Sequence, residues 1–205
     1  MGTQPTRDTG RTRSYIGLGA NLGDAPSTLS AAVRALAALP GVRLRGVSAL
    51  YRTRPVGVAD QPDFHNAVVA LDVPTGPDAE TGALALLAAL KELERAFGRR
   101  RRRHWGPREL DLDLVLFGRH RIRVERHAST GGDRATGVAS WLEVPHPAAQ
   151  ERLFVLAPLA DLAPRSVPPG WPETVEAARR RRERVEGSDA ALPVGRWDPA
   201  TERWR

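Results

Sequence analysis

The sequence contains no cysteine, one methionine and one lysine among its 205 residues. Without cysteine the chain has no disulfide, no zinc–thiolate site and no thiol nucleophile. Aromatic residues are scarce, at 5%, and no apolar run approaches the roughly 20 residues that a membrane-spanning helix needs. The N-terminus also lacks the apolar segment of a secretory signal. We therefore expect a cytoplasmic protein that binds no membrane.

The basic residues are almost all arginine, and the formal net charge is +7. This charge favours an anionic partner, and two arginine runs, at 99–103 and 179–182, leave open a nucleic-acid-binding module that also uses Trp105. Abundant alanine beside the arginines indicates a GC-rich coding sequence as an equally good source of the bias. Carboxylates close to the first run would repel a nucleic-acid backbone, so we favour a nucleotide and expect no nucleic-acid partner.

Hydrophobic spacing and turn residues indicate one domain with extra segments. We expect a disordered N-terminal tail over residues 1–13, a folded domain over 14–164, a polar insertion at 119–141 and a C-terminal extension over 165–205. A helix is predicted to begin at the N-cap Asp24, a second to run from a cap at Thr75 or Gly76 to a stop at Gly98, and a third, after the last strand, over 153–162. Strands are expected at 15–19, 42–53, 64–73 and 110–117. The resulting β-α-β-β-α-β order predicts an α+β fold with helices packed on one face of an antiparallel sheet.

The segment 104–117 carries the clearest chemical pattern. It reads His-Trp-Gly-Pro-Arg-Glu-Leu-Asp-Leu-Asp-Leu-Val-Leu-Phe. The period-2 alternation predicts a strand with Asp111 and Asp113 on one face, roughly 6.5–7 Å apart. A bound cation would relieve the repulsion between them, and Mg²⁺ is commonly held by one or two carboxylates plus substrate phosphates. The alternative is two solvent-facing aspartates on an edge strand. The residues predicted to face the core are Leu110, Leu112, Leu114 and Leu116.

Several nearby residues have both a binding and a purely structural interpretation. Arg108 is fixed by Pro107 and stands three residues before Asp111, which suits a phosphate contact. The arginines of 99–103 could equally form a solvated surface. His146, between two prolines, is either a phosphate contact or a turn residue. Trp105 either stacks on a flat heterocycle or anchors a turn, and the amide of Asn66 in an apolar strand requires a partner.

Four blocks of sequence, at 15–23, 48–66, 105–113 and 144–154, together resemble one family. They are similar, in the same order, to the 6-hydroxymethyl-7,8-dihydropterin pyrophosphokinases of folate biosynthesis. The third block, Trp-Gly-Pro-Arg-Glu-Leu-Asp-Leu-Asp, is the most specific. The resemblance implies a ferredoxin-like α/β sandwich. It also implies an enzyme that transfers the pyrophosphoryl group of ATP to the pterin hydroxymethyl oxygen and releases AMP.

The same resemblance implies roles for individual residues. Two Mg²⁺ ions would be held by Asp111 and Asp113. The catalytic residues would be Arg99, Arg108, Asp111 and Asp113. The ATP-binding residues would be Arg99, Arg101, Arg108, Leu114, His146 and Arg152. The pterin-binding residues would be Thr53, Val56, Phe64, Asn66, Trp105 and Phe154, with the rings of Phe64 and Phe154 on either side of the pterin.

The chain also departs from the family pattern. His104 stands where arginine is expected, and Arg54 stands where a smaller or neutral residue is common. The polar insertion and the C-terminal extension exceed what the family needs. An inactive family member serving as a scaffold is therefore an alternative, but retention of both aspartates and Arg108 favours an enzyme. We expect it to act as a monomer on two small-molecule substrates.

Overall fold

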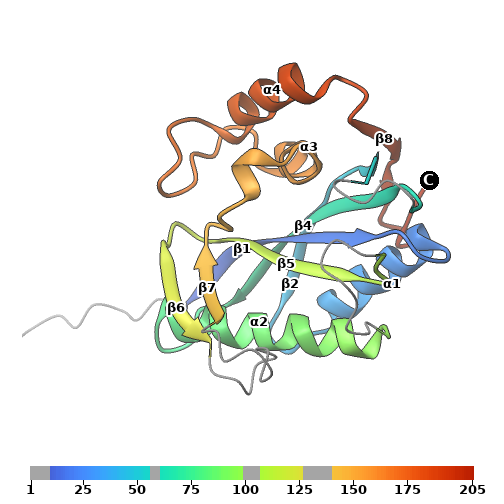
Figure 1. Cartoon of the computed structure of the whole chain (residues 1–205). Coiled ribbons are helices and arrows are strands. Elements are labelled where there is room, and N and C mark those ends of the chain that lie inside the picture. Colours follow the sequence, from blue (N-terminus) through green and yellow to red (C-terminus); the bar gives the residue numbers. More distant parts are fainter. Residues whose placement is uncertain (1–9, 56–60, 99–106, 127–139) are drawn as a thin grey trace, which may run out of the picture.

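The computed structural model describes residues 10–55, 61–98, 107–126 and 140–205, and it forms an antiparallel sheet covered by helices on both faces (Figure 1). The helices are α1 (Ala25–Ala37), α2 (Ala79–Ala96), α3 (Leu153–Leu162) and α4 (Val175–Glu186), with a 3₁₀ turn η2 (Ala149–Glu151) before α3. The strands are β1 (Arg11–Ala20), β2 (Arg43–Val47), β3 (Leu50–Thr53), β4 (Phe64–Pro74), β5 (Asp111–Phe117), β6 (Ile122–Arg126), β7 (Ser140–Val144), β8 (Ala191–Gly195), β9 (Trp197–Asp198) and β10 (Arg203–Trp204).

The main sheet has six strands. Its order is β5-β1-β4-β3-β8, with β2 also paired to β4, and every pairing is antiparallel. The predicted single strand over 42–53 is two strands, β2 and β3, with a break at Ser48 and Ala49. Ser48 stabilises this break because its hydroxyl accepts the β4 backbone N–H of Val68 at 2.9 Å. The α+β sandwich predicted from the sequence is confirmed.

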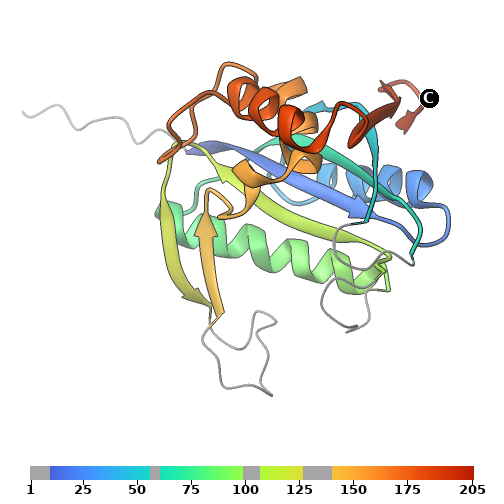
Figure 2. The same ribbon diagram turned by 45° about the horizontal axis from the view of Figure 1, so that its top comes forward.

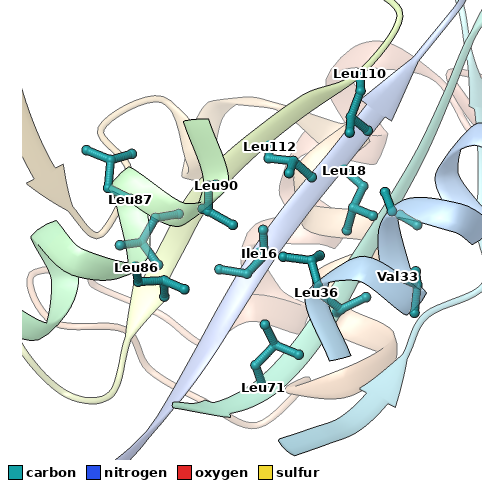
Figure 3. Packing of buried hydrophobic residues seen from close by; sticks show 14 of the residues in the cluster. Ile16, Leu18, Val33, Leu36, Leu71, Leu86, Leu87, Leu90, Leu110 and Leu112 are labelled. Carbon is teal, nitrogen blue, oxygen red and sulfur yellow. The ribbon is translucent and has the colours of Figure 1, made fainter. Parts of the chain in front are cut away.

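Helices α1 and α2 cover one face of the sheet and bury the larger apolar core (Figure 3). Leucines of both helices and Val33 of α1 meet Ile16 and Leu18 of β1 and Leu112 of β5 there. As predicted, Asp24 caps α1, since its carboxylate accepts the N–H of Ser27 at 3.1 Å. Aliphatic packing thus fixes the position of β5 and β1, the two strands that matter most for the site.

Helices α3 and α4 cover the opposite face, so the expectation of helices on one face is incomplete (Figure 2). The β-α-β-β-α-β order accounts for α1 and α2, whereas α3 and α4 follow it in the chain. Val68 and Val115 of the sheet pack against Leu156 and Leu159 of α3, and α4 adds Val175. This second face carries the candidate site.

The prediction that Leu116 faces the same core as the other leucines of β5 is wrong. The register between β1 and β5 shifts between Tyr15 and Ile16, so Tyr15 lies opposite Leu116 and Ile16 opposite Leu114. Because this irregularity inserts one residue into β5, Val115 and Leu116 both join the α3 cluster, while Phe117 returns to the α1–α2 core.

Three predicted segments contain more regular structure than expected. Strand β1 begins at Arg11, within the predicted tail, because β4 extends far enough to pair with it and Asp72 forms an ion pair with Arg13. Strand β6 lies within the predicted insertion and pairs with β7, which begins at its end, and Ile122 and Leu142 of these strands are buried against the core. The extension contains α4 and three strands. Among the described residues, no helix is both long and apolar enough to span a bilayer.

Candidate active site

Asp111 and Asp113 lie on the α3 face of β5, at the edge of the sheet. On β1 their register partners are Gly19 and Gly17, respectively. Leu112 between them is fully buried on the opposite face. The alternation of leucine and aspartate therefore divides β5 into an anchoring face and a carboxylate face.

The glycines opposite the aspartates leave space beside the carboxylates. A Cβ atom at Gly19 would lie 3.1 Å from Asn66 Oδ1 and 4.0 Å from the Cβ of Asp111. At Gly17 the same atom would lie 3.9 Å from the Cβ of Asp113. Both glycines line a cavity on this face. Larger residues at these two positions would reduce the room for a ligand next to the carboxylates.

Two cavities meet at Asp113 and His146. The larger, of about 350 Å³, extends from these residues toward Leu114 and Lys91 and the β7 strand. The smaller, of about 50 Å³, extends toward β1, β4 and the start of α3. It brings together six residues predicted for three different roles, namely Asp111, Asp113, Asn66, His146, Arg152 and Phe154.

Arg108 lines neither cavity but forms an ion pair with Asp111 through its Nη1 atom. Asn21, which is only 4% exposed, holds the backbone of Arg108 from both sides. The Asn21 side-chain oxygen accepts the N–H of Arg108 at 2.8 Å, and its backbone N–H donates to the Arg108 carbonyl at 3.1 Å. The Asn21 amide also donates to Gln61 Oε1 and to the carbonyl of Pro62. Asn21 thus connects the segment after β3 to the segment before β5.

Asn66 is the buried polar residue of β4, and its partner is Thr53. The Asn66 Nδ2 atom donates to Thr53 Oγ1 at 2.7 Å, which leaves the amide oxygen directed toward Gly19 and the smaller cavity. Phe64 pairs with Thr53 across β3 and β4 and is half-buried. The adjacent His65 faces the other side of β4, where burial and the charge of Arg52 lower its pKa. His65 therefore stays neutral near pH 7 and outside the site.

His146, Arg152 and Phe154 form the wall that faces β5. The backbone N–H of His146 donates to the carbonyl of Val115 at 2.9 Å. The peptide bond just before this segment, between Val144 and Pro145, is cis. The Nδ1 of His146 accepts the N–H of Ala148 at 3.3 Å, so in the neutral ring the proton is assigned to Nε2. The guanidinium of Arg152 lies over the ring of Phe154, 5.6 Å from its centroid. Two side chains that can contact an anion thus stand beside an aromatic ring.

Glu94 of α2 fixes the carboxylate strand from behind, a role that the sequence interpretation missed. This side chain is 2% exposed. It accepts the N–H of Leu112 at 2.8 Å and the ammonium of Lys91 at 2.7 Å, and Lys91 also donates to the Leu112 carbonyl. A signal was present, because Glu94 stands four residues after Leu90, on the apolar stripe of the helix. A carboxylate at such a position requires buried partners.

Some predicted residues lie apart from the others or outside the described residues. Leu114 is buried and lines the larger cavity, as its predicted contact with adenine requires. Thr53 and Phe64 line neither of the two cavities and reach the site through Asn66. The remaining predicted residues, Val56, Arg99, Arg101 and Trp105, lie outside the residues that the structure describes, as does His104.

The carboxylate face suits a hard divalent cation. Within the described ranges Asp113 makes no side-chain hydrogen bond or ion pair, although it is only partly exposed. In those ranges no three acidic, histidine or cysteine side chains cluster as a metal site. Mg²⁺ does not need such a cluster, because it commonly combines one or two carboxylates with waters and substrate phosphates. The donor set therefore fits Mg²⁺ bound together with a phosphorylated substrate.

Solved structures of Plasmodium falciparum HPPK-DHPS have a similar fold. The chain is similar to Plasmodium falciparum HPPK-DHPS wild type with pterin and p-hydroxybenzoate, with a TM-score of 0.69 and 13% identity over 98% of this chain. It is also similar to the wild-type protein with pteroate, with a TM-score of 0.69 and 12% identity over 98% of this chain. The chain spans 49% and 48% of those two chains, about half their length. This likeness supports the α+β fold.

The family model of 7,8-dihydro-6-hydroxymethylpterin-pyrophosphokinase matches residues 15–164, and the chain belongs to this family. Two proteins named 2-amino-4-hydroxy-6-hydroxymethyldihydropteridine pyrophosphokinase are similar along most of their length. The one from Methylorubrum extorquens is 41% identical over 167 residues, which are 82% of this chain and 91% of that protein. The one from Pseudomonas aeruginosa is 44% identical over 152 residues, 74% of this chain and 81% of that protein.

Family membership and these relatives confirm the function predicted from the sequence. The chain is a kinase of the pyrophosphokinase type that acts on a dihydropterin in folate biosynthesis.

Proposed function

We propose that this chain transfers the pyrophosphoryl group of ATP to 6-hydroxymethyl-7,8-dihydropterin at the junction of the two cavities. The observation that carries this assignment is that Asp113 and His146 line both cavities. A nucleotide in the larger cavity and a pterin in the smaller one would meet at these residues. The attacking hydroxymethyl oxygen and the β-phosphorus of ATP would then be neighbours, and AMP would leave from the nucleotide side.

The two aspartates are proposed to hold two Mg²⁺ ions together with the ATP phosphates. When bound, such ions neutralise phosphate charge and lower the pKa of a coordinated hydroxyl group. The chain itself contributes the rigidity of the two carboxylates, since Leu112 between them is tied to Glu94. Transfer of a phosphoryl-type group depends mainly on positioning and charge stabilisation, and a fixed strand supplies the positioning.

The cationic residues are proposed to bind the phosphates. Arg108 carries a planar guanidinium that can bind phosphate oxygens in pairs, and it already lies next to Asp111. His146 lines both cavities, and the proton on its Nε2 can be donated to a phosphate because Nδ1 accepts the N–H of Ala148. Arg152 lies at the smaller cavity. By resemblance, Arg99 and Arg101 add further contacts, and Leu114 packs against adenine.

The pterin is proposed to bind beside Asn66. An amide can donate and accept at once, which suits the edge of a pterin, and the Asn66 oxygen remains available because its nitrogen is bonded to Thr53. Phe154 lines the same cavity and offers a ring face. By resemblance, Phe64 stacks on the opposite side, and Val56 and Trp105 complete the pocket. We further propose, as expected from the sequence, that the chain acts as a monomer in the cytoplasm.

The structure gives one argument against the nucleic-acid alternative. Each arginine in the second run, at 179–182, forms an ion pair with a glutamate of the same chain. These intramolecular pairs neutralise the run, so it is a poor electrostatic surface for a phosphate backbone.

A direct assay tests the proposal. The protein is mixed with Mg²⁺, ATP and 6-hydroxymethyl-7,8-dihydropterin, and the nucleotide products are separated. We expect AMP in equimolar amount to the pterin diphosphate, formed only when the pterin is present. Formation of ADP, or no turnover after confirmed folding, contradicts the proposal. Asp198→Asn is a suitable control, because this partly exposed carboxylate of β9 lines neither cavity and should leave turnover unchanged.

A further inference from the structure

Strand β8 of the C-terminal extension is built into the main sheet beside β3 (Figure 1). It follows residue 164, where the family match ends. In the register of the two strands, Ala191 lies opposite Thr53 and Leu192 opposite Arg52. Strand β3 is short, with four residues, and lies between β4 and β8. Without β8, one side of β3 would have no paired neighbour in the described sheet.

The residue at the end of β3 belongs to the proposed pterin subsite. Thr53 is 5% exposed and accepts the hydrogen bond from Asn66. Its partner Ala191 is buried in a small cluster with Leu153 and Ala157 of α3. Leu153 directly precedes Phe154, the aromatic residue of the smaller cavity. One position on β8 therefore contacts the two elements that carry Asn66's partner and Phe154.

A second contact links the extension to the chain just after β3. Arg54 forms an ion pair with Asp189 at 3.0 Å, immediately before β8. Asp189 stands in a turn that begins at Gly187, whose φ of +95° favours glycine. This ion pair is exposed, so its contribution is small, but it joins Asp189 to the residue next to Thr53.

The far end of the extension is anchored independently of these contacts. The Trp204 indole N–H donates to the carbonyl of Ser48 at 2.9 Å, at the break between β2 and β3. Trp204 also packs edge-on against Trp197, with centroids 4.8 Å apart. Arg34 of α1 donates to the carbonyl of Glu202. The extension is thus attached before and after β8, which holds that strand in place along β3.

We propose that residues 187–195 are a positioning element for the pterin subsite, acting through β3 and its Thr53. The inference rests on the proposed function and adds to it a role for the C-terminal extension. It distinguishes the two substrates, because the larger cavity is lined by α2, β5, β7 and the turn after β7, none of which pairs with β8. Loosening β8 should therefore weaken pterin binding and leave ATP binding nearly unchanged.

The test compares two proline substitutions in the same strand. Leu192→Pro removes a backbone N–H at a position paired with β3. Val194→Pro is the matched control, because Val194 falls at the register shift and has no register partner on β3, both strands being fully described. Binding of 6-hydroxymethyl-7,8-dihydropterin is measured in the presence of α,β-methylene-ATP, and binding of that nucleotide is measured alone. Amide hydrogen exchange reports on β3 directly.

For Leu192→Pro we expect the pterin dissociation constant to rise by about fivefold or more, the scale of a lost ladder hydrogen bond. Exchange of the β3 amides should accelerate, and nucleotide affinity should stay within about twofold of wild type. Val194→Pro should match wild type in all three measurements. An equal loss of affinity for both ligands, or faster exchange on β3 with unchanged pterin affinity, overturns the inference.

A milder variant keeps the test decisive if Leu192→Pro fails to fold. Asp189→Asn should raise the pterin dissociation constant by about twofold through the lost ion pair, and Asp189→Glu should restore it. Wild-type pterin affinity in Asp189→Asn would then overturn the inference. A wild-type protein that forms no AMP and binds no pterin contradicts the proposed function itself, whereas an active wild type with unaltered variants contradicts only the role of β8.

Discussion

Replacing Asp113 by asparagine should abolish most turnover while leaving the protein at least as stable as wild type. Within the described ranges, this carboxylate has no hydrogen-bond or ion-pair partner to lose. Its main interaction is repulsion from Asp111, two residues along the strand and therefore about 7 Å away. A residue retained despite that repulsion is expected to serve ligand binding rather than folding.

Coulomb's law sets the size of the effect on stability. At about 7 Å two like charges repel by about 0.6 kcal/mol in water and by about 2.4 kcal/mol at an effective dielectric constant of 20. Arg108 is paired with Asp111 and cancels much of this field. We therefore expect Asp113→Asn to raise the free energy of unfolding by about 0.5 kcal/mol. Asp111→Asn should instead lower it by up to about 1 kcal/mol, because the ion pair with Arg108 is lost.

The catalytic activity of Asp113→Asn should fall although its stability does not. Loss of one charged ligand for a divalent cation should lower kcat by about 10²–10³-fold, comparable to losing a major transition-state contact. The assays are urea unfolding in EDTA and initial rates of AMP formation at saturating Mg²⁺. The nucleotide with Mg²⁺ should also stabilise wild type more than Asp113→Asn, since preferential binding to the native state raises its stability. Turnover within about tenfold of wild type, or destabilisation by more than about 2 kcal/mol, would refute this reasoning.

Three further outcomes follow from the contacts around the site. Glu94→Ala should lower the free energy of unfolding by about 3 kcal/mol, because the Lys91 ammonium and the buried N–H of Leu112 both lose their carboxylate partner. Urea unfolding midpoints measure this loss. Adding Lys91→Met to Glu94→Ala should recover part of it. Asn21→Ala removes three side-chain hydrogen bonds and should raise KM for both substrates, as steady-state kinetics would show. Hydrogen bonding to Arg179 lowers the pKa of Glu176 to about 2 from an ordinary 4.5. Its stabilisation should therefore be complete above pH 4.5 and disappear as the pH falls toward 2, and acid unfolding curves should show a smaller loss for Glu176→Gln over that range.

The carboxylate face was predictable because strand periodicity is a local property. The alternation around Leu112 is enough to place Asp111 and Asp113 together, and the sharp capping signal at Asp24 is equally local. The irregularity that redirects Leu116 was not predictable in this way, because it depends on how β1 and β5 meet in three dimensions. Patterns in one strand carry no information about the register of its neighbour.

The long-range contacts of the site had weaker signals. The pairing of β8 with β3 joins residues about 140 positions apart, as Thr53 and Ala191 show, and nothing in the short β8 segment identifies its partner. Asn21 belongs to a block that resembles the family, but its bridging role depends on two distant loops. Glu94 could have been found, because a carboxylate on the apolar stripe of a helix conflicts with the pattern around it.

The position of Lys91 has a practical consequence for handling the protein. Lys91 is the single lysine of the sequence, so amine-directed reagents can modify one ε-amino group. Its side chain is 19% exposed and lines the larger cavity. Succinimidyl dyes or amine-coupled biosensor chips would therefore attach either at the chain terminus or beside the nucleotide pocket. The rate of labelling at Lys91 Nζ, measured with and without ATP, would therefore report whether the larger cavity is occupied.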